Sequence, residues 1–155
     1  MDEAMQDNVR DRAPVHLWIV GILSLLWSGI GCYDYLMTRM RNTDYLASMM
    51  PEVDPNAMLA WVDAFPIWAQ FGWGLGVWAG LLGSLLLLIR NRWAVLAFGL
   101  SLVGAVLGLG YQIVGAPPMP GSPGGMMEIM PYVIIAIAIG LFLYARAMRA
   151  KGVLR

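Results

Sequence analysis

Asp34 is the residue in this sequence whose type and surroundings are most suited to chemistry. It is the single acidic residue inside an apolar stretch, and it lies between Tyr33 and Tyr35 near the end of the stretch 15–37. In a helix that crosses a membrane, a carboxylate costs roughly 2.5–3.5 kcal/mol at the centre and less near an interface. Acidic residues at such depths commonly bind protons or cations, or pair with basic side chains. The end of this stretch is therefore where we look for a site.

Asp34 allows two interpretations. In the interpretation we favour, it forms an ion pair with Arg39 or Arg41 at the membrane surface, because both are close in sequence and Asp34 lies at shallow depth. In the alternative, it is a proton or cation site that faces Gln70 and Gln112 on neighbouring spans. The predicted ligand or partner site on this face consists of Asp34, Tyr35, Arg39, Arg41, Asn42, Asp44, Tyr45, Gln70 and Gln112.

Methionines near the same face offer a second kind of chemistry. Met37, Met40, Met126 and Met127 could supply thioether ligands to Cu(I). Methionine is also a common filler of irregular helix interfaces, and no histidine or cysteine strengthens the group on that side. We therefore predict no metal and no cofactor, with copper as the less favoured alternative.

Motifs of enzymatic chemistry are missing from the sequence. It contains no glycine-rich phosphate loop ending in Lys-Ser/Thr, no HExxH and no CxxC. The single histidine, His16, lies at the start of the first apolar stretch and far along it from Ser28. Ten basic and ten acidic residues give zero net charge, so nothing indicates a nucleic-acid partner. We expect a protein that is not an enzyme.

Four apolar stretches must position these residues, namely 15–37, 66–89, 93–115 and 129–148. Each has about 20 residues or more, the length that crosses a hydrocarbon core of about 30 Å. Hydrophobic residues make up 59% of the chain and charged residues 13%, against roughly 45–50% and 25% in soluble domains. The sequence predicts an all-α polytopic membrane protein, a single domain over 1–155 with a four-transmembrane-helix bundle.

Basic residues in the flanks predict its orientation. Only Arg39 and Arg41 lie on one side, whereas the other side carries Arg10, Arg12, Arg90, Arg92, Arg146, Arg149, Lys151 and Arg155. Positively charged flanks stay in the cytoplasm. We expect both termini in the cytoplasm of a bacterial inner membrane, with 1–14 as a cytoplasmic tail.

The two outer loops differ in composition. In the loop 38–65, Asp54 and Pro55 are typical of a helix start, and apolar residues such as Leu59 and Val62 follow at helical spacing. This amphipathic outer-loop helix is predicted to lie on the membrane surface. The loop 116–128 is rich in glycine and proline and is predicted to be flexible.

Small residues predict how the spans pack, because they allow close approach of helices in lipid. One stripe of each span is small, which favours a compact bundle; alternatively, one stripe mediates dimerisation. The stripes of the second and third spans are Gly72, Gly76, Gly80 and Gly83, and Ser101, Gly104 and Gly108; the fourth span has Ala136, Gly140 and Ala147.

The stretch 27–45 (WSGIGCYDYLMTRMRNTDY), together with 65–68, 80–94 and 144–155, resembles a known family. Its most specific element is Asp34-Tyr35-x-Met37-Thr38, followed by Arg41-Asn42 and Tyr45. The chain is similar to small four-helix proteobacterial inner-membrane proteins, some of which carry the loose label "sugar transporter". The resemblance covers most of the chain and implies the fold and the membrane, but no mechanism.

Three classes of function follow as expectations. We expect an accessory or structural component of a membrane complex, whose partners are the lipid bilayer and another membrane protein or a second copy. The alternative is a small solute transporter or permease subunit that works as an oligomer. A periplasmic-side sensor or metal-binding protein is the third.

Overall fold

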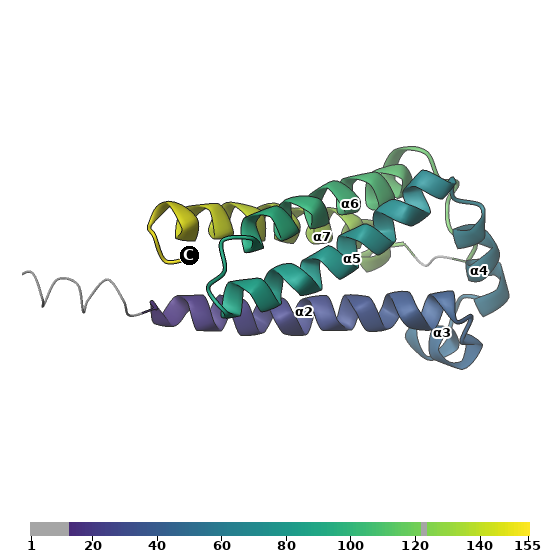
Figure 1. Ribbon diagram of the computed structural model, residues 1–155. Helices are drawn as coiled ribbons and strands as arrows, with labels where there is room; N and C mark the ends of the chain where they lie inside the picture. The colour runs from purple at the N-terminus through teal and green to yellow at the C-terminus, as the bar shows by residue number, and fades with distance from the viewer. Residues whose placement is uncertain (1–12, 122–123) are drawn as a thin grey trace, which may run out of the picture.

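A computed structural model describes residues 13–121 and 124–155 of the chain, apart from the side chains of Met126 and Met127. The described part is helical and has no strand. Its helices are α2 (Val15–Arg39), α3 (Thr43–Met49), α4 (Pro55–Asp63), α5 (Ile67–Leu88), α6 (Ala94–Val114) and α7 (Met126–Ala150) (Figure 1). Within α2, α5, α6 and α7 lie apolar segments long enough to cross a membrane, which confirms the four predicted spans.

The charges divide between the two ends of the molecule. The basic end contains the start of α2, the turn between α5 and α6 and the end of α7, and the acidic end contains α3, α4 and the outer loops (Figure 1). The described basic residues of the basic end are Arg90, Arg92, Arg146, Arg149, Lys151 and Arg155. All described acidic residues are at the acidic end. Arg10 and Arg12 lie outside the described residues, as does most of the predicted tail 1–14.

The closest helix pair is α5 with α6, because glycines of the two helices face each other. A Cβ atom added at Gly72 would lie 2.6 Å from Cβ of Leu107, and one at Gly104 would lie 2.6 Å from the Gly72 carbonyl oxygen. A Cβ atom at Gly108 would lie 2.9 Å from the Trp73 backbone nitrogen. The Ser101 hydroxyl donates to the Gly76 carbonyl at 2.7 Å. The two stripes thus pack on each other within one chain.

The remaining spans extend this pair on both sides. α2 packs on α5, and α7 packs on α6. At the basic end, α2 and α7 come together: His16 hydrogen-bonds the Tyr144 hydroxyl. A buried cluster fills the same end and consists of Leu17, Leu87, Ala94, Phe98, Ala145, Met148 and Leu154. Toward the acidic end, cavities take the place of this core.

The small-residue face of α7 points away from its neighbours. Ala136, Gly140 and Ala147 are exposed, and a Cβ atom added at Gly140 would meet nothing within 4 Å. The prediction that this stripe packs inside the bundle is therefore wrong. The reason is that α7 packs on α6 through larger side chains, such as Phe142 against Gly99.

The last residues fold back over the basic end. The Arg155 backbone nitrogen donates to the Arg90 carbonyl, and the Arg92 nitrogen donates to the Arg155 carbonyl, each at 2.8 Å. Leu154 is 4% exposed and belongs to the buried cluster. We call residues 151–155 the C-terminal hook.

The outer loop 38–65 forms two short helices. Arg41 has a φ of 57°, in the left-handed region, and the chain reverses there after α2. The Asn42 side chain then accepts a hydrogen bond from the Tyr45 backbone nitrogen at 3.0 Å and begins α3, which was not predicted. Asp54 begins α4 in the same way, accepting from the Asn56 nitrogen at 3.2 Å.

α4 packs apolar residues on the protein. Its apolar residues Leu59 and Val62 are 5% and 8% exposed. The prediction of a surface-bound apolar face is wrong for these residues, because the ends of the spans offer them an apolar surface within the protein. The Trp61 indole nitrogen donates to the Pro117 carbonyl at 2.7 Å and ties α4 to the loop 116–128. The predicted flexibility of that loop falls in part on 122–123, outside the described residues.

Candidate functional site

Two cavities lie between the helices toward the acidic end. The inner cavity has a volume of about 310 Å³ and is bounded by α2, α5, α6 and α7, with α3 at its outer end. Its lining is apolar with few exceptions and includes Trp27, Ser28, Asp34, Tyr45, Trp73, Ser101, Leu109, Met130, Ile134, Ala138 and Leu141.

The outer cavity has a volume of about 220 Å³ and lies beneath α4. Its lining includes Thr38, Met50, Met58, Trp61, Gln70, Gln112, Met119 and Pro131. Both cavities are lined by Asp34, Trp73, Leu109, Met130 and Ile134. The two cavities are therefore neighbours, and Asp34 lies where they adjoin.

Asp34 binds a tyrosine and not an arginine. The Tyr45 hydroxyl donates to Asp34 Oδ1 at 3.1 Å, and the rings of Tyr45 and Tyr33 pack edge to face with centroids 5.4 Å apart. The predicted ion pair with Arg39 or Arg41 is wrong. Arg39 is five residues along the same helix, which places it about 140° around the axis from Asp34.

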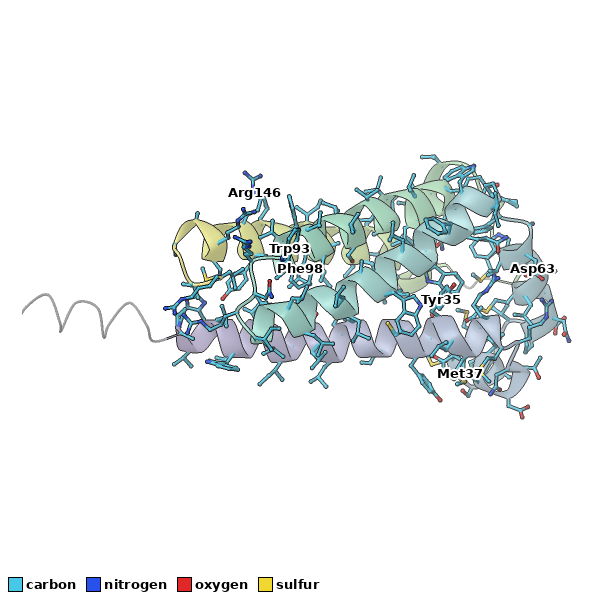
Figure 2. The ribbon with its side chains drawn as sticks, in the orientation of Figure 1. Tyr35, Met37, Asp63, Trp93, Phe98 and Arg146 are labelled. Atoms are coloured by element: carbon cyan, nitrogen blue, oxygen red, sulfur yellow. The ribbon has the colours of Figure 1, made fainter. Side chains whose placement is uncertain are left out.

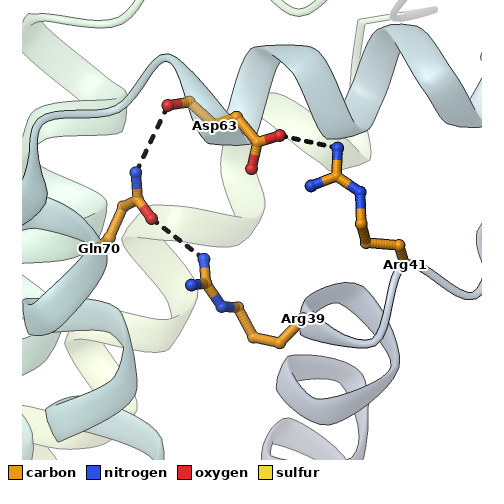
Figure 3. Close-up of polar contacts among 4 residues, drawn as sticks. All are labelled: Arg39, Arg41, Asp63 and Gln70. Carbon is orange, nitrogen blue, oxygen red and sulfur yellow. Dashed lines mark hydrogen bonds and ion pairs between the residues drawn. The ribbon is translucent and has the colours of Figure 1, made fainter.

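The two arginines instead join the ends of three helices (Figure 3). Arg39 Nη1 donates to Gln70 Oε1 at 3.0 Å, and Arg41 Nη2 pairs with Asp63 Oδ2 at 2.9 Å. Gln70 Nε2 donates to the carbonyls of Phe65 and Asp63 at 2.8 and 3.4 Å. This network links α2, α4 and α5 at the mouth of the outer cavity, and the exposed Arg41–Asp63 pair adds little energy by itself.

Aromatic side chains hold the walls around Asp34. Tyr35 lies between α2 and α5, where its ring packs edge to face on Trp73 with centroids 4.9 Å apart (Figure 2). At the end of the molecule, Phe65 packs on both Trp61 and Tyr111, at 4.6 and 5.1 Å. These contacts give the cavities fixed walls of aromatic rings.

The structure brings together only part of the predicted site. Asp34 and Tyr45 are in direct contact, and Gln70 and Gln112 line the outer cavity. Asn42 caps α3, and Asp44 is exposed in its first turn, so neither lines a cavity. Sequence reasoning missed Trp73, Leu109, Met130 and Ile134, which line both cavities. Apolar residues inside a span carry no signal that distinguishes a cavity wall from a packed interface.

The described residues hold no group of three or more His, Cys, Asp or Glu that could bind a metal. Of the methionines considered for copper, Met37 accepts a hydrogen bond from Asn42 at 3.6 Å and Met40 is 70% exposed. The side chains of Met126 and Met127 lie outside the described part. Four other methionines, Met50, Met58, Met119 and Met130, line the outer cavity. Flexible thioethers suit surfaces that adapt to apolar ligands.

Tyr45 should titrate well above a free tyrosine. Burial, and after it the charge and hydrogen bond of Asp34, raises the pKa of Tyr45 from 10.0 to about 12. The pKa of Tyr45 is higher in the folded state than in the unfolded state. Its contribution to the free energy of unfolding is therefore complete below pH 10 and is lost as the pH rises toward about 12. The difference between the absorbance titrations of the wild type and of Tyr45→Phe isolates the ionisation of Tyr45. In Asp34→Asn the pKa of Tyr45 should fall but stay above 10.0, because burial persists. An unchanged pKa in that variant would contradict the contact.

Four helices long and apolar enough to cross a membrane define this chain as an integral, multi-pass membrane protein. Comparison with protein-family models, curated proteins and solved structures finds no match to this chain.

Proposed function

We propose that this membrane protein is an accessory component, without enzymatic activity, that holds an apolar chain such as a lipid tail in its inner cavity. The inner cavity is the observation that carries the proposal. Its volume of about 310 Å³ falls at the lower end of the range for ligand pockets, roughly 300–1,000 Å³. Its few polar groups, Ser28, Asp34, Tyr45 and Ser101, are set in apolar walls, as in sites that orient an apolar ligand.

The floor of the inner cavity favours a flexible chain over a partner helix. Helices dock in lipid on small residues that leave the backbone open. Here Gly76 and Gly104 already pack on each other's helix, and the space beside Gly80 is taken by Ser101. The small-residue stripe at the floor of the inner cavity is thus used within the chain.

The packed side chains at the basic end support a protein that binds an apolar chain over one that transports a solute. Leu17, Leu87, Phe98 and Met148 are buried side by side there, and His16 joins Tyr144 above them. A solute that entered from the acidic end would meet this packed core. This core favours binding of a ligand over transport of a solute.

The orientation and the membrane are part of the same proposal. The charge division between the ends supports cytoplasmic termini in a bacterial inner membrane by the positive-inside rule. The resemblance to the small four-helix inner-membrane family also stays a prediction.

A tryptophan placed in the inner cavity should expel the bound chain. Ala138 lines the inner cavity, whereas Ala136, two residues earlier on α7, is exposed. Native mass spectrometry in mild detergent should find lipid on the wild type and on Ala136→Trp, and about tenfold less on Ala138→Trp, a difference of about 1.4 kcal/mol. A lipid-free wild type, or equal retention by both variants, would refute the proposal.

A further inference from the structure

Asp34 is placed to recognise the polar end of whatever lies in the cavities. It lines both cavities, and among the described residues that line either of them it alone carries a charge. A charge that lines apolar cavities at this depth requires a counter-charge or hydrogen bonds. Tyr45 supplies one hydrogen bond to Asp34, and the carboxylate can accept several, so a cationic donor on a ligand suits its other acceptor positions.

The protein itself supplies no described cation to Asp34. Its Oδ1 atom accepts from Tyr45, while Arg39 bonds Gln70 and Arg41 pairs with Asp63. No ion pair joins Asp34 to any basic residue of the described part. The undescribed positions 122 and 123 are serine and proline, which carry no charge. Tyr45 and Trp73 line the same cavity as Asp34, and aromatic rings attract cations.

The inner cavity has the length of one lipid tail. Along α7 it is lined from Met130 to Leu141. At 1.5 Å per residue this is about 16 Å, close to half of a hydrocarbon core of about 30 Å. A tail of one leaflet thus fits below Asp34. In the outer cavity above it, Thr38 and Gln112 provide hydroxyl and amide groups of the kind that bind phosphate oxygens.

We infer that the occupant is a phospholipid of the leaflet at the acidic end whose headgroup carries a protonated amine, with the ammonium on Asp34 and one tail along α7. This inference rests on the proposed function, since it names the lipid that the inner cavity holds. Charge complementarity excludes an anionic headgroup such as phosphatidylglycerol, whose phosphate would approach Asp34 without a compensating cation.

The test offers two lipids with identical tails. Wild-type protein in mixed micelles of equimolar phosphatidylethanolamine and phosphatidylglycerol is analysed by native mass spectrometry for the lipid that it retains. Wild type should enrich the ethanolamine lipid about tenfold over the input, the effect of one hydrogen bond to a charged group. Asp34→Asn should retain the two lipids nearly at the input ratio. Asp34→Glu, which preserves the charge, should restore the enrichment.

Each outcome separates the two proposals. If wild type binds lipid at the input ratio, the inference is overturned and the proposed function stands. Equal enrichment in wild type and Asp34→Asn removes Asp34 from recognition and also overturns it. A wild type that retains no lipid overturns both. If Asp34→Asn does not fold, Tyr45→Phe takes its place, because it frees Oδ1 of Asp34 but leaves the carboxylate. Retention of the enrichment in Tyr45→Phe supports the inference, and loss of the enrichment overturns it.

Discussion

Replacing Gly104 with alanine should lower the free energy of unfolding by about 1–3 kcal/mol, the range found when well-packed interiors are overfilled. The new methyl group would lie 2.6 Å from the Gly72 carbonyl oxygen and 2.7 Å from the Gly76 Cα, both backbone atoms that cannot rotate away. α5 and α6 would have to separate. Because this pair forms the floor of the inner cavity, lipid retention should fall with stability. Thermal unfolding in detergent, followed by tryptophan fluorescence, measures the change.

Gly110→Ala is the matched control on the same helix. A Cβ atom at Gly110 would meet nothing within 4 Å. Alanine there removes only the helical cost of glycine, so stability should be unchanged or rise by up to about 1 kcal/mol. Of the two identical substitutions, only Gly104→Ala should destabilise the protein. Equal effects at both positions would show that helix propensity, and not the contact of α5 with α6, decides the stability.

Leu154→Ala should cost about 2–5 kcal/mol, as for other buried leucines. Leu154 is 4% exposed in the cluster that closes the basic end, although it follows the last span and belongs to the C-terminal hook. Its removal leaves a void among Leu17, Leu87 and Met148. Loss of stability should appear as earlier thermal unfolding, accompanied by faster proteolysis at the basic end.

Lys151→Ala provides the comparison within the same hook. Lys151 is exposed, so its replacement should change stability by no more than about 0.5 kcal/mol. If Leu154→Ala unfolds at the same temperature as Lys151→Ala and the wild type, the hook does not contribute to the core.

The spans could be predicted from the sequence because their signal is local. Length and hydropathy set the limits of α2, α5 and α6 to within two residues of those observed, and Asp54-Pro55 marked the start of α4. α3 was missed because it has only seven residues, although Asn42 carried the signal of a helix cap. The hook was missed since Arg155 bonds Arg90 and Arg92, about sixty positions earlier, and no local pattern reports such contacts.

Only part of the site could be predicted, again because the sequence carries local signals. Asp34 could be singled out by its charge in an apolar stretch, and Tyr45 by nearness in sequence. Their contact depends on the left-handed Arg41, which turns α3 back beside α2 and brings Tyr45 to Asp34 in place of an arginine. The cavities could not be predicted at all. Whether Trp73 or Ile134 borders a void depends on how α2, α5, α6 and α7 are placed around it, which no single helix encodes.

The place of α7 in the inner cavity has a consequence for the assembly of the protein in the membrane. The inner cavity needs α7 as a wall, and α7 follows the other three spans along the chain. During synthesis α2, α5 and α6 can associate first, and Asp34 then faces the surrounding lipid across an open side. The lipid of the proposed function would then be the one beside Asp34 when α7 inserts, so the protein would acquire it during assembly and not afterwards.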